Sequence, residues 1–421
     1  MSAPTAVDPE RRSRGISRRL PLIALLTANA FSACGSIMTV LAVPWFVLAT
    51  TGSAAKTGLT AGAEVVGTVV AALLAGPVVD RFGRRAVSVT SDLAAAAVVA
   101  TIPLLHATVG LPFGALLVLA VALGMAVAPG ETARKSMMPG LIAVTGVSGE
   151  RAASGYDGVS RGARMLGAPL AGVLIAVIGP QSVLLVDAGT FLVSALLIRA
   201  FVPVVGGAAE TEPGRYLTRL RRGLAYLRQD RLMGGIVLMI SVTNLLDAAF
   251  FSVLMPVFAK DVLHSSIALG LMSGVFNAAA LTGSLAFAWA GPRLPRRLTF
   301  AFAFLLSGAP RFVVLALGAP LPVVLVLWAV LGLGVGAINP VLGVTQYERV
   351  PESVLPMVFG VMYAGAYCGM PLGTALAGLS VEGFGLVATL WAGAVVYLGA
   401  TLCPLLFPTW RQMDHRIPAT T

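Results

Sequence analysis

Apolar runs follow one another along the whole chain, separated by Gly, Pro or charged residues. A helix needs about 20 apolar residues to cross the hydrocarbon core of a bilayer. Lipid-exposed backbone has to satisfy its own hydrogen bonds, so runs of that length predict membrane-spanning α-helices. Twelve runs qualify, with approximate limits 21–49, 57–78, 86–107, 112–134, 157–178, 181–202, 233–258, 267–290, 297–318, 321–346, 354–379 and 384–408.

The composition supports this class and excludes others. Only 11% of the 421 residues are charged and 57% are hydrophobic, whereas a soluble domain carries about 25% charged residues. The net charge of +11 does not indicate a nucleic-acid partner, because the basic residues are dispersed among short segments between apolar runs. We therefore expect an all-α integral membrane protein, monomeric and embedded in the lipid bilayer.

The basic residues also predict an orientation. With the N-terminus in the cytoplasm, all but three of the 29 basic residues fall on the cytoplasmic side. The exceptions, on or near the outer side, are Lys56, Lys260 and Arg311. Twelve spans return the chain to its starting side, so the positive-inside rule predicts a multi-pass protein of the cell membrane with both termini cytoplasmic.

The longest polar stretch separates the spans into two groups of six. It carries Leu217, Leu220, Leu224 and Leu227 at helical spacing, which predicts an amphipathic helix at the membrane surface. The predicted organisation is a cytoplasmic arm over 1–20, an N-terminal six-helix bundle over 21–202, a cytoplasmic linker over 203–232, a C-terminal six-helix bundle over 233–408 and a cytoplasmic tail over 409–421.

The two groups of spans resemble each other in sequence. Gly and Pro recur in the same order and at similar offsets, which is not expected by chance for a whole series of pairs. We therefore expect two pseudo-symmetric six-helix bundles. The matching pairs are Pro44 with Pro256, Gly58 with Gly270, Gly62 with Gly274, Pro129 with Pro340, Gly167 with Gly369 and Pro169 with Pro371.

A charged motif lies between the second and third spans. A charged side chain at the bilayer centre costs at least about 2.5–3.5 kcal/mol, so the motif predicts a short loop where the chain leaves the membrane and returns. A second copy over 291–297 keeps basic residues and lacks the acid. The first copy, called here the charged motif, consists of Gly76, Asp80, Arg81, Gly83, Arg84 and Arg85.

The charged motif resembles the loop signature of the major facilitator superfamily. The resemblance implies that Asp80 contacts the inner end of a helix of the second half and that Arg84 pairs with a nearby acid. Such contacts would close the cytoplasmic side as a gate. The alternative is that the motif only enforces topology.

Further stretches resemble the drug-exporter branch of this superfamily, which includes macrolide, tetracycline and Tap-type multidrug efflux pumps. The similar stretches are 44–48, 51–53, 129–139, 187–191 and 294–297. One departure concerns the first span, where many relatives carry Gly-Asp and this chain has Gly35-Ser36. The acid that could carry protons in those relatives is therefore absent here, and in this protein any proton-coupling role must belong to other residues.

Small residues predict close helix approach in the fifth and eleventh spans. Helices in lipid associate through such residues, and the superfamily resemblance implies that these two spans run along the interface between the bundles. Ordinary packing and sliding between conformations are both compatible with the pattern. The positions are Gly167, Pro169, Gly172, Gly369, Pro371 and Gly373.

Two acids within spans are candidates for proton coupling. Asp247 lies near the middle of the seventh span and Glu64 in the outer half of the second, and ionisable residues at such depth are functional candidates. The hypothesis is that Asp247, with Glu64, alternates between a proton and a cationic substrate. The alternative is a structural acid hydrogen-bonded to a neighbouring helix.

Other intramembrane charges have simpler interpretations. Asp187 is predicted to be structural, and Asp92 could pair with loop arginines. Asp157, Arg161 and Arg164 cluster at the inner end of the fifth span, where ion pairs and a vestibule lining are both open.

A drug cavity needs apolar and aromatic surface with a few polar groups. Each candidate is equally compatible with ordinary packing. No enzyme motif, Walker loop or metal-ligand cluster is found, so we expect no cofactor and a proton gradient as the energy source. The cavity candidates are Asn29, Phe31, Asn244, Phe250, Phe251, Asn277, Asn339, Gln346, Tyr363 and Tyr367.

The sequence thus predicts a proton-coupled antiporter that exports amphipathic, drug-like small molecules by alternating access. Two alternatives stay open: export of an endogenous siderophore or secondary metabolite, and a transporter-like sensor or lipid-handling protein.

Overall fold

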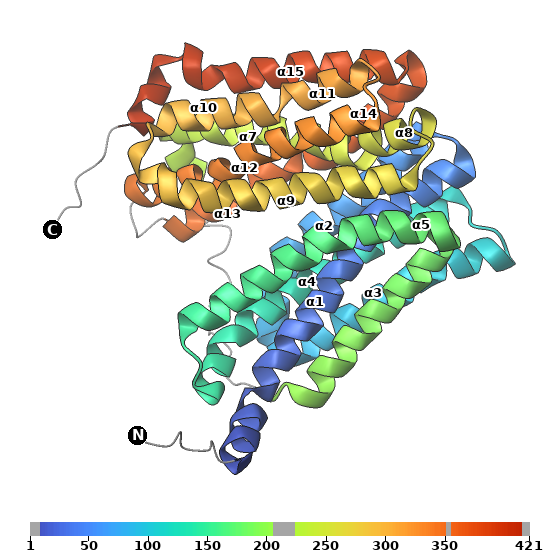
Figure 1. Cartoon of the computed structure of the whole chain (residues 1–421), viewed down its shortest axis with the longest axis vertical. Coiled ribbons are helices and arrows are strands. Elements are labelled where there is room, and N and C mark those ends of the chain that lie inside the picture. The colour runs from blue at the N-terminus through green and yellow to red at the C-terminus, as the bar shows by residue number, and fades with distance from the viewer. Residues whose placement is uncertain (1–8, 205–223, 351–354, 415–421) are drawn as a thin grey trace, which may run out of the picture.

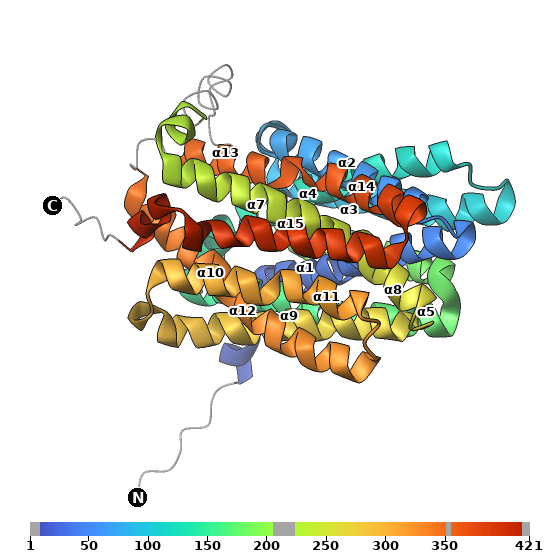
Figure 2. The same cartoon turned by 90° about the horizontal axis from the view of Figure 1, so that it is seen from above.

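The computed structural model describes residues 9–204, 224–350 and 355–414, and this part of the chain is helical without a strand. Its helices form two bundles, one from each half of the sequence (Figure 1). The N-terminal bundle is drawn in blue to green and the C-terminal bundle in yellow-green to red. Figure 2 shows the same two bundles from above.

Five helices make six spans in the N-terminal bundle. The longest, α5, is broken at Gly179, whose φ of +79° lies in the left-handed region that glycine adopts without strain. Pro180 follows directly, and the chain reverses there to cross the membrane a second time. The helices are α1 (Pro9–Thr51), α2 (Ala54–Phe82), α3 (Arg84–Thr108), α4 (Phe113–Thr145) and α5 (Gly149–Phe201).

The C-terminal bundle contains six spans, of which three are interrupted. A π-helical turn η1 (Phe250–Leu254) joins α7 (Arg231–Ala249) to α8 (Met255–Asp261). Gly308 separates α10 (Arg296–Ser307) from α11 (Ala309–Ala316), and Gly369 separates α13 (Leu355–Cys368) from α14 (Met370–Phe384). The remaining elements are α9 (Ser266–Ala290), η2 (Gly291–Arg293), α12 (Leu321–Arg349), α15 (Leu386–Leu406) and η3 (Pro408–Met413).

Ten helices of the described chain are long and apolar enough to cross a membrane. That number counts α5 once, although it crosses twice, and omits the broken α13–α14 pair, so the structure contains twelve crossings. The predicted fold class of twelve transmembrane helices in two bundles is confirmed.

The bundles meet at one end and diverge toward the other (Figure 1). At the closed end, α2 packs on α14 and α5 crosses α9. A Cβ atom at Gly172 would lie 2.7 Å from the Ser266 carbonyl oxygen and 2.9 Å from the Gly270 Cα, so the α5 and α9 backbones touch. The start of α1 and η3 lie at the divergent end, called here the open end.

Several boundaries differ from the sequence prediction. The charged motif is not a loop: α2 continues through Phe82, α3 begins at Arg84, and only Gly83, with φ +84°, interrupts the helix. Helix α4 continues to Thr145, far past the predicted limit of 134. The predicted limits lie where polar residues interrupt the apolar run. The helix itself continues past such residues wherever neighbouring helices supply hydrogen-bond or ion-pair partners for the polar side chains.

The linker prediction is only partly described. Leu217 and Leu220 lie outside the described residues, whereas 224–229 are helical. The Tyr226 hydroxyl donates to the Arg349 carbonyl oxygen at 3.1 Å, and burial together with the Asp230 carboxylate raises the pKa of this phenol. Arg349 also forms an ion pair with Asp230 at 2.6 Å, which fixes the start of α7 to the end of α12.

Glu382 of α14 bridges the bundles at the closed end. Its carboxylate accepts hydrogen bonds from the Ser53 hydroxyl at 3.0 Å and the Ala55 backbone N–H at 3.2 Å, at the positive end of the α2 dipole. Replacing Glu382 by alanine should weaken closure, so a single cysteine at the buried Thr57 position should react with a maleimide about 2–5 times faster. Glu150→Ala, an exposed acid elsewhere, is the control; equal rates in both variants would contradict the role of Glu382.

Candidate functional site

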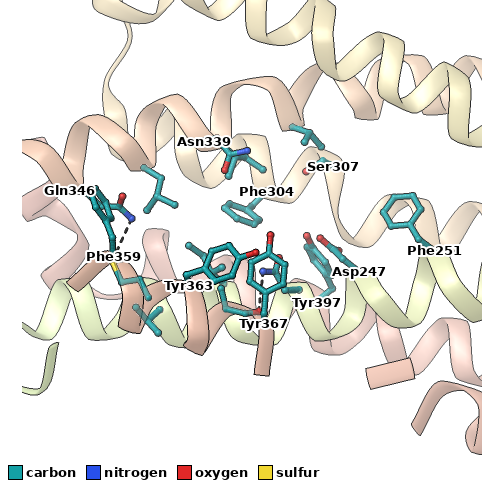
Figure 3. Close-up of a pocket in the computed structure, with 18 of the residues that line it drawn as sticks. Asp247, Phe251, Phe304, Ser307, Asn339, Gln346, Phe359, Tyr363, Tyr367 and Tyr397 are labelled. Carbon is teal, nitrogen blue, oxygen red and sulfur yellow. Dashed lines mark hydrogen bonds between the residues drawn. The ribbon is translucent and has the colours of Figure 1, made fainter. Parts of the chain in front are cut away.

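A cavity of about 720 Å³ opens within the C-terminal bundle. Its wall combines aromatic rings with a few polar groups, as ligand pockets generally do. Figure 3 shows Tyr397 beside Asp247, then Tyr367 and Tyr363 in turn, with Asn339 and Gln346 farther along the wall. Tyr363 and Tyr367 stack with ring centroids 4.3 Å apart, which gives the cavity a flat aromatic surface.

The charged centre of this cavity is an ion pair between Asp247 of α7 and Arg311 of α11. The Arg311 side chain is 3% exposed, whereas the Asp247 side chain is 32% exposed. Arginine thus lies in the wall and aspartate faces the cavity. The pair neutralises both charges in a low-dielectric surrounding, where an unpaired charge would be strongly destabilising.

Four aromatic rings enclose the Arg311 guanidinium. Its central carbon lies 4.8 Å from the ring centroid of Phe250, 5.2 Å from those of Phe251 and Phe312, and 5.1 Å from that of Tyr397. Cation–π attraction to these rings holds the guanidinium where no bulk water can solvate it.

Two irregular backbone segments build this centre. The π-helical turn η1 begins directly after α7 and supplies Phe250 and Phe251; such turns are frequent at functional sites. A side chain at Gly308 would collide with the Tyr397 ring, so glycine is needed there. The break at Gly308 starts α11 and turns Arg311 toward Asp247.

A second, smaller cavity of about 330 Å³ lies between the bundles and is called here the vestibule. Asn339 of α12 lines both cavities, so they adjoin. The N-terminal bundle contributes a charged wall, in which Glu131 of α4 lies 2.9 Å from Lys135 and 3.8 Å from Arg164. The remaining lining residues include Tyr156, Asp157, Ser160, Arg161 and Asn277.

A buried ion pair also lies in the core of the N-terminal bundle. Arg134 Nη1 of α4 is 3.0 Å from Asp92 Oδ1 of α3, with side-chain exposures of 3% and 4%. The Ser32 and Ser194 hydroxyls complete the coordination of Asp92, at 3.2 and 2.6 Å. The prediction that Asp92 pairs with loop arginines is therefore wrong, because its partner is a core residue of α4.

Two further acids within the spans of this bundle, Asp187 and Glu64, have no such partner. Asp187 is fully buried and accepts hydrogen bonds from Thr39 and Thr190. Glu64 is half-buried on α2. Neither carboxyl forms an ion pair with a basic residue of the described chain.

The predicted cavity residues divide between several places. Asn29 is buried in the N-terminal bundle and donates to Ser160 at 2.8 Å, and Phe31 is exposed. Phe250 is buried behind the cavity as part of the arginine enclosure, and Asn277 lines the vestibule. The structure brings the others together in the larger cavity: Asn244, Phe251, Asn339, Gln346, Tyr363 and Tyr367.

The predicted inter-bundle positions also separate. Three of them, Pro169, Gly172 and Pro371, contact the opposite bundle at the closed end. The other three face their own bundle: Gly167 lies against α1, and Gly369 and Gly373 lie against α7.

In the charged motif, Arg85 donates to the Arg199 carbonyl oxygen of α5, and the Arg81 guanidinium lies 5.5 Å from the Phe82 ring centroid. The second copy of the charged motif, over 291–297, contacts acidic residues from other parts of the C-terminal bundle. Arg296 binds Glu348 of α12 through two hydrogen bonds of 2.6 and 2.8 Å. The Arg297 backbone N–H donates to Asp414 beyond η3 at 3.0 Å.

Sequence reasoning missed the partner of Asp247. Arg311 was expected on or near the outer side, and the structure instead buries it beside Asp247. The sequence did indicate that Arg311 could be buried, because this residue lies well inside the apolar run 297–318. Tyr397, Phe304 and Ser307 of the cavity wall carry no such signal, because aromatic and small polar residues are common in every span.

No group of three metal-ligating side chains occurs among the described residues. The chemistry that the site can perform is reversible binding of an amphipathic molecule. Aromatic rings would hold its apolar part, and the carboxylate of an ion pair that can open or close would contact its polar part.

Comparisons with known proteins agree with this description. The family model of the Major Facilitator Superfamily matches residues 25–245 and 237–419. The multidrug efflux pump Tap of Mycobacterium tuberculosis is 32% identical over 404 residues, which cover 94% of this chain and 96% of that pump. The Tap pump of Mycolicibacterium fortuitum is 31% identical over 403 residues, covering 94% and 98%.

Among solved structures, the nucleoside transporter NupG superposes with a TM-score of 0.74 at 14% identity, over 92% of this chain and 99% of that one. This likeness shows the fold alone. The family model covers nearly the whole chain, and the two Tap pumps each cover 94% of it. The chain therefore belongs to the major facilitator superfamily and is a multi-pass membrane transporter of small molecules rather than an enzyme.

Proposed function

We propose that this transporter is a proton-coupled antiporter that exports amphipathic, drug-like compounds from the cytoplasm. The observation that carries the proposal is the aromatic cavity of about 720 Å³ with the Asp247–Arg311 pair in its wall. This protein is similar to multidrug efflux pumps over most of its length, and this similarity supports drug export. A monomer without a cofactor, driven by the proton gradient, suffices for this function.

The transport cycle alternates access to the cavity. With both termini in the cytoplasm, the open end faces the cytoplasm and the closed end faces outward, so the structure corresponds to an inward-facing state. The cargo enters through the vestibule past Asn339, which lines both cavities. In the outward-facing state the charged motif closes the cytoplasmic side, with Asp80 and Arg84 as its gating contacts.

Coupling requires that cargo and proton exclude each other. Asp247 is the cavity-facing member of its ion pair, so a bound cargo can displace its carboxylate from Arg311, and a proton can neutralise it when the cargo leaves. Glu64, half-buried in the N-terminal bundle, is the second coupling acid. Because Arg311 already neutralises Asp247, the cavity does not require a cationic cargo.

Purified protein in liposomes tests the function directly. An imposed pH gradient should drive uptake of at least one of three fluorescent or radiolabelled probes, namely tetracycline, erythromycin and ethidium, and a protonophore should stop it. Uptake that persists with the protonophore would contradict proton coupling. Drug export would be overturned if none of the three probes is taken up into liposomes and if cells that overexpress the protein gain no resistance. This result would favour the siderophore, metabolite or sensor alternatives.

A further inference from the structure

Asp187 is the most deeply buried acid of the membrane region that lacks a cationic partner among the described residues. Its exposure is 0%. The other two deeply placed aspartates, Asp92 and Asp247, are each neutralised by an arginine, Arg134 and Arg311. An ionised carboxylate without a counter-charge is very costly in such a place. Asp187 is therefore most stable as a neutral, protonated acid while it remains sealed.

The surroundings of Asp187 are hydroxyls and backbone. Thr39 of α1 donates to one carboxylate oxygen, and the Thr190 hydroxyl lies 3.2 Å from the other. A Cβ atom at Gly35 would collide with this carboxyl group, so α1 closes one side of it. Cys34 of α1 and Glu64 of α2 are the other titratable groups near Asp187.

Hydroxyl groups continue from Asp187 toward the vestibule. Thr190 and Ser194 follow it at helical spacing on α5, and Ser32, Ser36 and Thr39 share the facing side of α1. These five residues are called here the hydroxyl seam. Its far end reaches the buried ion pair of the bundle, because the Ser32 and Ser194 hydroxyls both donate to Asp92.

The vestibule begins just beyond that ion pair. Arg134, the partner of Asp92, carries an Nε atom without a hydrogen-bond partner in the described chain. The buried Tyr156 hydroxyl, which has no partner there either, belongs to a side chain that lines the vestibule. The seam therefore extends from Asp187 to polar groups at the edge of the vestibule.

We propose that Asp187 is a further proton-carrying site, in addition to Asp247 and Glu64. Its proton is exchanged along the hydroxyl seam of the N-terminal bundle, and the site is separate from the cargo cavity of the C-terminal bundle. A proton taken up from the outside neutralises the carboxylate, and its release to water in the vestibule restores the carboxylate.

The site is also linked to the bundle interface. Gly35 touches Asp187, and the adjacent Cys34 lies against Gly167 of α5. The same stretch of α5 reaches the other bundle at Gly172, where its backbone meets Gly270. Loss of the proton from Asp187 would require α1 and α5 to admit solvent, which would disturb the helix that closes the outer end.

This inference rests on the proposed function, and its test separates the two. Wild-type protein and Asp187→Asn are compared with whichever of tetracycline, erythromycin and ethidium the wild type transports. Probe-induced proton release in weakly buffered detergent should fall to about half or less in Asp187→Asn. Uptake driven by a pH gradient should fall about tenfold or more. Probe exchange without a gradient should stay within about twofold of wild type, because the cargo cavity is intact.

Unchanged proton release in Asp187→Asn would overturn the inference, and so would loss of exchange together with uptake, which indicates a purely structural acid. If this variant does not fold, Thr39→Val decides: it keeps the acid and should displace the pH profile of uptake by about half to one unit. An unchanged profile would reject the seam. Asp261→Asn, an exposed acid at the end of α8, should leave every reading as in wild type. Absence of gradient-driven uptake by the wild type would instead contradict the proposed function.

Discussion

Replacing Asp247 by leucine is expected to destabilise the protein by about 3–5 kcal/mol and to abolish transport driven by a pH gradient. The change leaves the Arg311 guanidinium, which is 3% exposed, without its counter-charge. The surrounding rings recover only part of that loss. Thermal unfolding in detergent measures the stability, and liposome uptake of the transported probe measures the activity.

The double variant Asp247→Leu/Arg311→Met separates stability from function. Two well-packed apolar side chains often replace a buried ion pair at little cost, so melting should return close to the wild-type temperature while transport remains lost. As the matched control, Asp261→Ala breaks the exposed Lys260–Asp261 pair and should change stability by less than about 1 kcal/mol. A single variant that melts like wild type would refute the role of Asp247 as the counter-ion of Arg311.

Replacing Gly172 by leucine is expected to prevent α5 and α9 from meeting, so that the two bundles cannot come together at the closed end. The obstacle is backbone, namely the Ser266 carbonyl and the Gly270 Cα, which cannot move aside as a flexible side chain can. A shift of about 1.4 kcal/mol toward the outward-facing state reduces the inward-facing population about tenfold relative to the other. Transport should fall by a similar factor, because the cycle needs both states.

Cysteine labelling measures this shift. A single cysteine at Asn339, placed in a chain without the native Cys34, Cys368 and Cys403, reports access to the vestibule from the open end. Gly172→Leu should slow its reaction with an impermeant maleimide about tenfold. Gly189→Leu is the control, since a Cβ there meets open space on the same helix. Equal labelling in the two variants would show that the Gly172 contact does not govern closure.

The apolar pattern predicted the twelve spans because a helix inside the membrane is apolar on nearly all of its surface. Such a helix appears in the sequence as a long run of apolar residues. Span boundaries were less predictable. Arg134 interrupts the hydropathy of α4, yet the helix continues because Asp92 neutralises the arginine inside the bundle. Arg311 was placed on or near the outer side for the same reason, since hydropathy registers a charge but not the partner that makes its burial possible.

Within the site, the sequence marked Asp247, Asn339, Gln346, Tyr363 and Tyr367, all of which line one cavity in the structure. Polar and aromatic residues at intramembrane depth are rare enough to be noticed. The sequence could not distinguish a cavity wall from a helix contact, and the six inter-bundle positions illustrate this: half of them face the opposite bundle and half face their own.

What the sequence determined by itself is therefore the class, the number of spans and the internal repeat, because each depends on composition and periodicity along one helix at a time. Only the tertiary structure decided which charges neutralise one another. Asp247 and Arg311 come from different spans, as do Asp92 and Arg134, and Asp187 is left among hydroxyls. The free energy of a buried charge depends on its neighbours in space, and no pattern along the chain specifies them.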